Sequence, residues 1–216
     1  SHMAELLLQK GYTVYGMVRQ RSAPDHGRIA HLAPQLKLLL GDLTDQGSLI
    51  RAVRTAQPDE VYNFAAQSFV GASWDQPVLT AEVTGLGVTR LLEAVRQECP
   101  LARFYQASSS EQFGDAKVTP QDESTPFQPR SPYGAAKAYG HYIAQNIRES
   151  YGLFVCAGIC FNCEGPRRGA EFVTRKVSLA AARIRVALDR GEKPEPLILG
   201  NMNARRKPTP SEDGQP

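Results

Sequence analysis

Tyr133 and Lys137 stand four residues apart near the start of residues 131–150, a segment whose pattern predicts a helix. Ser131 is a favourable N-cap, and Pro132 suits the first helical turn. Residues four apart share one helix face, so the two side chains are expected side by side. A free tyrosine hydroxyl titrates at about 10, and we expect the Lys137 ammonium and the helix N-terminus to favour its phenolate. The pair alone fits either a solvated helix surface or a catalytic base with its tuning charge.

A serine and a glutamate precede this helix, at the end of an apolar segment. Ser109 ends residues 102–109, a predicted strand, and Glu111 follows two positions later. The Ser109 hydroxyl can donate to, and accept from, a substrate oxygen on which Tyr133 would act. A dehydrogenase needs only the serine, tyrosine and lysine, so a carboxylate beside them indicates a second proton transfer at a neighbouring carbon. The alternative for Glu111 is an ordinary solvated loop acid.

Short apolar segments alternate with amphipathic ones along the chain. Strands are predicted at residues 12–18, 36–40, 60–66, 102–109 and 153–161. Helices are predicted at residues 4–11, 27–32, 45–56, 78–98, 131–150 and 172–191. This alternation is typical of the α/β class, with a doubly wound, Rossmann-like parallel sheet that helices cover on both faces.

Polar residues follow each predicted strand. In chain order they are Arg19-Gln20-Arg21-Ser22, Gly41-Asp42-Leu43, Gln67-Ser68, Ser109-Ser110-Glu111 and Asn162-Cys163-Glu164. Ligands of such sheets bind beyond the carboxyl ends of the strands, which all meet at one edge. That edge is therefore the predicted site.

Composition argues against several functional classes. Of 216 residues, 42% are hydrophobic and 22% are charged, as in ordinary globular proteins. The net charge of +3 is too small to indicate nucleic acid as a partner. No apolar stretch predicts a membrane span, so a cytoplasmic location is expected. Cys156, Cys160 and Cys163 have the spacing of an iron–sulfur site, but the first two would lie roughly 13 Å apart along a strand, so no metal is predicted.

Several short motifs together resemble one protein family. They are "YNFAAQS", "YQASSSE", "SPYGAAKAYG", "GDLTD", "HGRIAHL" and "GPRRGAEFVTRK". These are similar to the extended short-chain dehydrogenase/reductase superfamily and, within it, to the GDP-mannose 4,6-dehydratase family. The likeness runs from Ala4 to Arg206. The Tyr-Lys motif is specific only to the superfamily, whereas "RSPYGAAK" and "PRRGAEFVTRK" in this order are more specific to the dehydratases.

The resemblance implies a hydro-lyase that holds NADP tightly and takes GDP-mannose as its substrate. Tyr133 would take the proton of the mannose 4-hydroxyl, and Glu111 would remove the proton at C5. Ser109 would help water to leave from C6, and Lys137 would hold the nicotinamide ribose. The product would be GDP-4-keto-6-deoxymannose, a precursor of fucose-type and rhamnose-type sugar nucleotides. A homo-oligomer, either a dimer or a tetramer, is also implied.

The same resemblance assigns the binding residues. Besides Tyr133 and Lys137, the cofactor positions are Arg19, Gln20, Arg21, Ser22, Asp42, Leu43, Phe64, Ala65, Ala66, Gln67, Ser68, Leu79, Cys163 and Arg168. The substrate positions are Ser68, Ser109, Asn162, Lys176 and Arg206. Positive charge between Arg19 and Ser22 suits the adenosine 2′-phosphate of NADP.

The sequence also departs from the family. Ser109 stands where threonine is usual, Cys163 where histidine is usual, and Gly165 where serine is usual. No Gly-rich turn of the G-x-G-x-x-G kind occurs. The family continues past Arg206 with Asp-Trp-Gly and about a third of its chain. We therefore expect the first strand with its Gly-rich turn, and the C-terminal part, to be either truncated or outside the given sequence.

Three regions and three functions are expected. Residues 4–165 would form the NADP-binding domain, residues 166–206 the start of the substrate-binding region, and residues 207–216 a tail that is disordered or foreign to the fold. The function is the dehydratase, a related nucleotide-sugar epimerase or reductase, or an inactive fragment that binds a partner. Glu111 separates the first two, because a simple 4-epimerase has no use for a base at C5.

Overall fold

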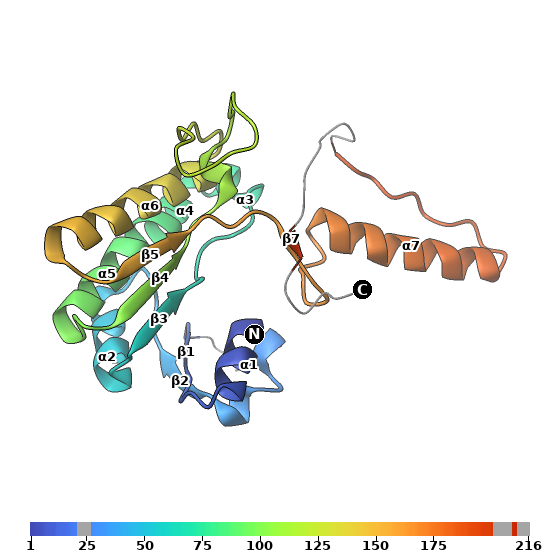
Figure 1. The fold of residues 1–216 in the computed structure, drawn as a ribbon. Helices are drawn as coiled ribbons and strands as arrows, with labels where there is room; N and C mark the ends of the chain where they lie inside the picture. The colour runs from blue at the N-terminus through green and yellow to red at the C-terminus, as the bar shows by residue number, and fades with distance from the viewer. Residues whose placement is uncertain (21–26, 201–208, 211–216) are drawn as a thin grey trace. The chain divides into compact units, whose positions relative to one another are not determined.

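The computed structural model describes residues 1–20, 27–200 and 209–210. The chain divides into two compact units, Ser1–Cys160 and Phe161–Pro216. Figure 1 shows the course of the chain, and the two units are described separately below.

The first unit confirms the α/β class with parallel strands, but its strands form two sheets and not the single sheet predicted. In one sheet, β1 (Tyr15–Val18) pairs with β2 (Lys37–Leu40). In the other, β4 (Arg103–Ala107) lies between β3 (Glu60–Asn63) and β5 (Val155–Gly158). Each observed strand lies inside a predicted one and is shorter. Among the described residues, no strand pairs with both β1 and β3 to join the two sheets.

The helices of the first unit follow the predicted order. They are α1 (His2–Gln9), α2 (Gln46–Ala56), α3 (Ala72–Asp75), α4 (Pro77–Thr80), a π-helix (Ala81–Leu86), α5 (Gly87–Glu98) and α6 (Pro132–Tyr151), with 3-10 turns at Gly27–Ile29, Ala33–Gln35 and Ser110–Gln112. The predicted helix at residues 78–98 is thus interrupted by a π-helical segment. Gly11, at φ 81°, ends α1, and Gly152, at φ 69°, ends α6, because glycine adopts this left-handed conformation without strain.

The hydrophobic core of the first unit lies between β3–β4–β5 and helices α2, α5 and α6. Leu49, Leu92 and Phe104 are almost completely buried there. Side chains alternate along a strand, so Val61 packs on this core while its neighbour Tyr62 lies on the opposite face, 36% exposed. The helices expected on both faces of this sheet are therefore seen on one face, where α2, α5 and α6 lie side by side in Figure 1.

The sheet of β1 and β2 contributes nothing to that core. Neither strand has a buried residue, and α1 has none either. Among the described residues of 1–40, Leu32 alone is buried. The sheet of β3, β4 and β5 is therefore packed on a hydrophobic core, whereas the sheet of β1 and β2 is not.

The second unit contains one long helix and a short strand pair. α7 (Val173–Asp189) confirms the predicted helix, and Gly191, at φ 71°, follows its end. β6 (Cys163–Glu164) pairs in parallel with β7 (Thr209–Pro210), which falls within the segment predicted as a tail. None of the described helices has the length and apolar character needed to cross a membrane.

Candidate active site

The start of α6 packs directly on the turn that follows β4. The Ser131 hydroxyl caps the helix by accepting a hydrogen bond from the backbone N–H of Gly134, at 3.0 Å, as its sequence position predicts. A Cβ atom at Gly134 would lie only 2.6 Å from the backbone oxygen of Glu111. The absence of a side chain at Gly134 therefore lets the helix approach the turn that carries Glu111. The sequence analysis did not single out this glycine.

The predicted base Tyr133 is enclosed beside Ser109. Tyr133 is only 8% exposed and forms a side-chain hydrogen bond with Ser109. Burial raises the pKa of Tyr133; the Ser109 hydrogen bond lowers it, and the nearby Glu111 carboxylate raises it. The Ser109, Glu111 and Tyr133 side chains thus influence one another directly, as their predicted joint role requires.

Lys137 is held one helical turn further along α6. Its ammonium donates to the backbone oxygen of Ala107 at 2.8 Å and lies 5.7 Å from the centre of the Tyr133 ring. Burial lowers the pKa of Lys137 to about 8. The burial of the tyrosine has the largest effect on its pKa and raises it, against the lowering expected from Lys137 and the helix start. The structure brings the four predicted catalytic residues together, with the tyrosine protonated at neutral pH.

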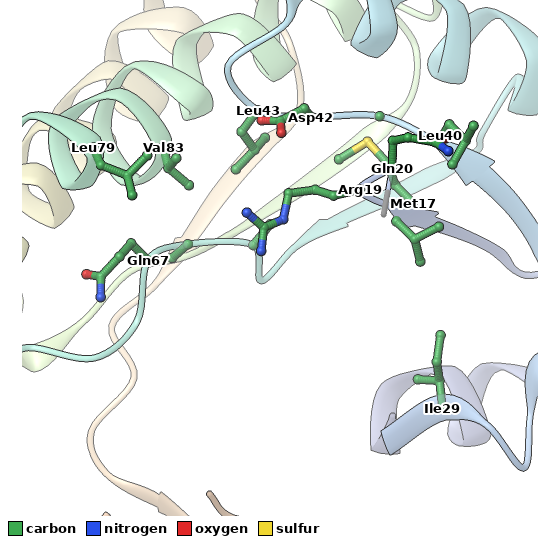
Figure 2. A pocket seen from close by; sticks show the side chains of 14 residues that line it. Met17, Arg19, Gln20, Ile29, Leu40, Asp42, Leu43, Gln67, Leu79 and Val83 are labelled. Atoms are coloured by element: carbon green, nitrogen blue, oxygen red, sulfur yellow. The ribbon is translucent and has the colours of Figure 1, made fainter. Parts of the chain in front are cut away.

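A hollow of about 740 Å³ lies beyond the carboxyl ends of β1, β2 and β3 (Figure 2). Most predicted cofactor residues of the first unit line it, namely Arg19, Gln20, Asp42, Leu43, Ala65, Ala66, Gln67 and Leu79. The prediction missed Met17, Val18, Ile29, Leu40 and Val83, which line it as well, together with Gly41 of the predicted site edge. Several of these are strand or helix residues whose apolar character signals only a core position.

Local hydrogen bonds and charge shape one wall of this hollow. The Asp42 carboxylate accepts hydrogen bonds from the backbone N–H and the hydroxyl of Thr44, both at 2.8 Å. These bonds lower the pKa of Asp42, and the charge of Arg19 adds to the effect. An ionised carboxylate can accept from ribose or base donors, and a guanidinium suits phosphate. The residues present therefore fit the adenosine half of a dinucleotide.

A π-helix fixes the opposite wall. The hydroxyl of Thr84, within the π-helix, accepts a hydrogen bond from the backbone N–H of Gln67 at 3.0 Å. Thr80 and Thr84 are both buried, and the Thr80 hydroxyl lies 3.4 Å from the Gln67 side-chain oxygen. Short π-helical segments are frequent at functional sites. No pattern in the sequence distinguishes this segment from the α-helix expected there.

The remaining predicted positions are distributed differently. Phe64 and Ser68 are exposed and do not line the hollow. Asn162, Cys163, Arg168 and Lys176 belong to the second unit, where Cys163 lies on β6. There the Arg168 guanidinium stacks 4.1 Å from the Phe172 ring centre, and the Lys176 ammonium donates to the backbone oxygen of Ile198 at 2.7 Å. Arg21, Ser22 and Arg206 lie outside the described residues. Within the described part of the chain, no group of His, Cys, Asp and Glu side chains could hold a metal ion.

Comparison with protein families gives one match along almost the whole chain. Residues 1–213 match the family model described as GDP-mannose 4,6 dehydratase. The GDP-mannose 4,6-dehydratase of Yersinia enterocolitica is 48% identical over 215 residues, which cover 95% of this chain and 56% of that protein. The human GDP-mannose 4,6 dehydratase is 48% identical over 217 residues, which cover 95% of this chain and 57% of that protein. The chain thus spans somewhat more than half the length of these relatives.

Solved structures of similar fold come from nucleotide-sugar enzymes. The UDP-glucose 4-epimerase of Thermus thermophilus, in complex with NAD, superposes with a TM-score of 0.72 at 30% identity, over 85% of this chain and 58% of that one. A dTDP-glucose 4,6-dehydratase of Streptomyces venezuelae, with NAD bound, superposes with a TM-score of 0.72 at 27% identity, over 88% of this chain and 58% of that one. Both relatives bind a nicotinamide dinucleotide.

Proposed function

The chain belongs to the GDP-mannose 4,6-dehydratase family, and from this premise we propose that it dehydrates GDP-mannose to GDP-4-keto-6-deoxymannose with bound NADP. Bound NADP would accept a hydride from C4 of the mannose and return it to C6. Arg19, Asp42 and Gln67 would hold the cofactor along the hollow, and Lys137 would hold its nicotinamide ribose.

Tyr133 would take the proton of the 4-hydroxyl as C4 becomes a ketone. Its hydrogen bond with Ser109 supports this role, because both hydroxyls can then meet the same substrate oxygen. The raised pKa of Tyr133 means that the positive charges of Lys137 and of the oxidised cofactor must favour the phenolate during the reaction. The low pKa of Lys137 allows it to pass on a proton near neutral pH.

Glu111 would act second, at C5. A ketone at C4 makes the C5 hydrogen acidic, so a carboxylate beside the site can remove it. The C6 hydroxyl would then leave as water, hydrogen-bonded by Ser109 and completed by the proton taken from C5. C5 would regain a proton from solvent as hydride returns to C6. The observation that carries the proposal is the position of Glu111, close enough to raise the Tyr133 pKa by its charge. This is a third acid–base group next to the serine–tyrosine–lysine set.

Two other functions compete with this one. The 30% identity with a UDP-glucose 4-epimerase supports a sister epimerase, and the other is an inactive chain that keeps the fold and binds a partner. Asn162, Lys176 and Arg206 are proposed to hold the nucleotide-sugar, with Ser68 beside the cofactor. A dimer or tetramer is also proposed, and light scattering that gives only the monomer mass at micromolar concentration would argue against it.

Incubation of the protein with GDP-mannose and NADP in deuterated water separates these functions. The dehydratase predicts a keto-sugar that has lost water and carries deuterium at C5, detected by NMR and mass spectrometry. An inverted C4 without deuterium at C5 indicates an epimerase. The absence of both a product and bound NADP indicates the inactive fragment. Glu111→Gln should abolish the C5 deuterium, and an unchanged label in that variant would remove Glu111 from the mechanism.

A further inference from the structure

A buried polar cluster lies next to the proposed catalytic residues and has no part in the mechanism above. It consists of Ser108, directly after β4, Gln112, which ends the turn carrying Glu111, and His141, four residues beyond Lys137 on α6. Ser108 is 4% exposed and Gln112 is 0% exposed. Buried polar groups of this kind are kept where their hydrogen bonds fix a particular arrangement.

The hydrogen bonds of this cluster have a direction. The Ser108 hydroxyl donates to the side-chain oxygen of Gln112 at 2.6 Å. The Nδ1 atom of His141 lies 3.2 Å from the same hydroxyl oxygen. A hydroxyl has one hydrogen, and Gln112 takes it, so the Nδ1 atom must carry a hydrogen and donate to Ser108. The chain of donation thus runs from α6, through Ser108, to the catalytic turn.

The surroundings keep the His141 ring uncharged and fixed in orientation. The Phe127 ring packs edge-on against His141 at 5.0 Å between ring centres, and Phe113 packs on Phe127 at 5.4 Å. Burial lowers the pKa of His141, and the positive charge of Arg148 lowers it further. These contacts favour a neutral ring, and the hydrogen on Nδ1 follows from the bonds of the Ser108 hydroxyl.

The carboxamide of Gln112 is held through its oxygen alone. Its nitrogen is buried and has no hydrogen-bond partner, whereas buried donors normally have one. The orientation of Gln112 therefore depends on Ser108, and through Ser108 on His141. The same 3-10 turn includes Glu111, whose backbone N–H donates to the Ser109 hydroxyl at 3.2 Å. A loss of the donor at position 141 is thus transmitted to both proposed catalytic groups of the turn.

We propose that His141 is a positioning residue, which acts through Ser108 and Gln112 to hold the turn of Ser109 and Glu111 against the tyrosine helix. The proposal rests on the proposed function only for the chemical role of Glu111. The hydrogen bonds from His141 to Ser108 and from Ser108 to Gln112 are present in the folded chain whatever its function. They connect α6 to the end of β4, as does the bond from Lys137 to the Ala107 oxygen.

Three variants and the unaltered protein test the proposal. His141→Phe keeps a ring against Phe127 but removes the donor, whereas His141→Asn places an amide N–H near the position of Nδ1. Tyr142→Phe is the matched control, because Tyr142 also packs on Phe127, at 5.3 Å, yet is 53% exposed. ¹⁵N NMR should find hydrogen on Nδ1 of His141, and hydrogen on Nε2 would overturn the proposal.

Hydrogen exchange and kinetics give the second part of the test. In His141→Phe, the amides of Glu111 and Gln112 should exchange about tenfold faster, and the C5 deuterium exchange should fall about tenfold with KM unchanged. His141→Asn should restore both, and Tyr142→Phe should change neither. A His141→Phe variant that behaves as the control, or an Asn variant without rescue, overturns the proposal. If the unaltered protein shows no C5 exchange, the proposed function fails, and the NMR and amide results still decide the role of His141.

Discussion

The sheet of β3, β4 and β5 and the sheet of β1 and β2 carry the two halves of the proposed site in different ways. Tyr133 and Lys137, beside the sheet of β3, β4 and β5, lie next to a core of residues that are almost completely buried. Arg19 and Asp42 follow β1 and β2, where neither strand has a buried residue. The groups for the chemistry are held by packing, whereas the groups proposed for the adenosine end follow strands that, within the described residues, pair with each other alone.

At the nucleotide end, local bonds hold the Asp42 side chain, although its neighbour Leu43 is buried in the core. Asp42 is fixed by Thr44, two residues away, and its backbone N–H donates to the Ser48 hydroxyl at 3.0 Å. Lys137, in contrast, is fixed by Ala107, thirty residues away in the sequence. Short-range bonds can persist when a region loosens, but long-range bonds require the fold. The catalytic geometry therefore depends on the folded core, and the contacts of the Asp42 side chain depend on it much less.

Removal of the proposed base should have the largest effect. Tyr133→Phe should lower turnover by about 10²–10⁴-fold, because it removes acid–base help while its ring still fills the same space. Steady-state kinetics measures this, with circular dichroism as the check on folding. Tyr139→Phe, on the same helix and 42% exposed, is the control and should leave turnover unchanged. A Tyr133→Phe variant that keeps more than about a tenth of the activity would mean that Tyr133 is not the base.

A pair of truncations compares the stability of the two regions. Leu92→Ala should lower the free energy of unfolding by about 2–5 kcal/mol, because Leu92 is completely buried. Met17→Ala, on β1, should cost less than about 1 kcal/mol, because Met17 is 37% exposed. Urea unfolding gives both values. Equal losses would mean that β1 belongs to the same packed core as α5.

The preference for NADP over NAD should depend on Arg19, which follows β1. Arg19→Ala should weaken NADP binding about tenfold and leave NAD binding unchanged, since a guanidinium suits the additional phosphate. Isothermal calorimetry with both dinucleotides measures the preference. Arg51→Ala, on the exposed side of α2, is the charge control and should bind as the unaltered protein does. An equal loss for NADP and NAD in Arg19→Ala would place Arg19 away from the 2′-phosphate.

A further effect concerns the pH dependence of stability. Lys137 titrates at about 8 when folded, and an unfolded lysine titrates at about 10.4. Between these values the unfolded chain binds more protons, so the free energy of unfolding should rise with pH. We expect a rise of about 2 kcal/mol between pH 8 and 10 that is absent in Lys137→Met. Urea unfolding at several pH values measures it, and parallel curves for the two proteins would contradict the burial of a charged lysine.

The sequence predicted the elements well because its signals were local. Ser131 caps α6, and Gly11 ends α1, as their residue types require. The apolar segments predicted the strands, although each observed strand is shorter, because apolar residues such as Phe64 and Phe154 lie just outside the strand pairing. The π-helix at Ala81–Leu86 was not predictable, since its hydrogen-bond shift depends on packing and on the bond from Thr84 to Gln67.

Within the site, residue types were easier to predict than their electrostatics. The motifs placed Ser109, Glu111, Tyr133 and Lys137 near one another, and the structure has them so. Their pKa values follow from burial, which a sequence does not contain, and the predicted lowering for Tyr133 was wrong for this reason. The contribution of His141 was also invisible, because a lone histidine on a helix has no pattern until Ser108 is seen beside it.

Native-state hydrogen exchange tests most directly whether packing stabilises the sheet of β3, β4 and β5 more than the sheet of β1 and β2. Four amides with similar hydrogen bonds make the comparison: Phe104 and Ser108 donate to β5 and its flank at 2.8 and 2.9 Å, and Lys37 and Gly41 donate to β1 and its flank, both at 3.0 Å. We predict that the first two exchange only through global unfolding and that the second two exchange at least about a hundredfold faster. Equal protection of all four amides would contradict the account.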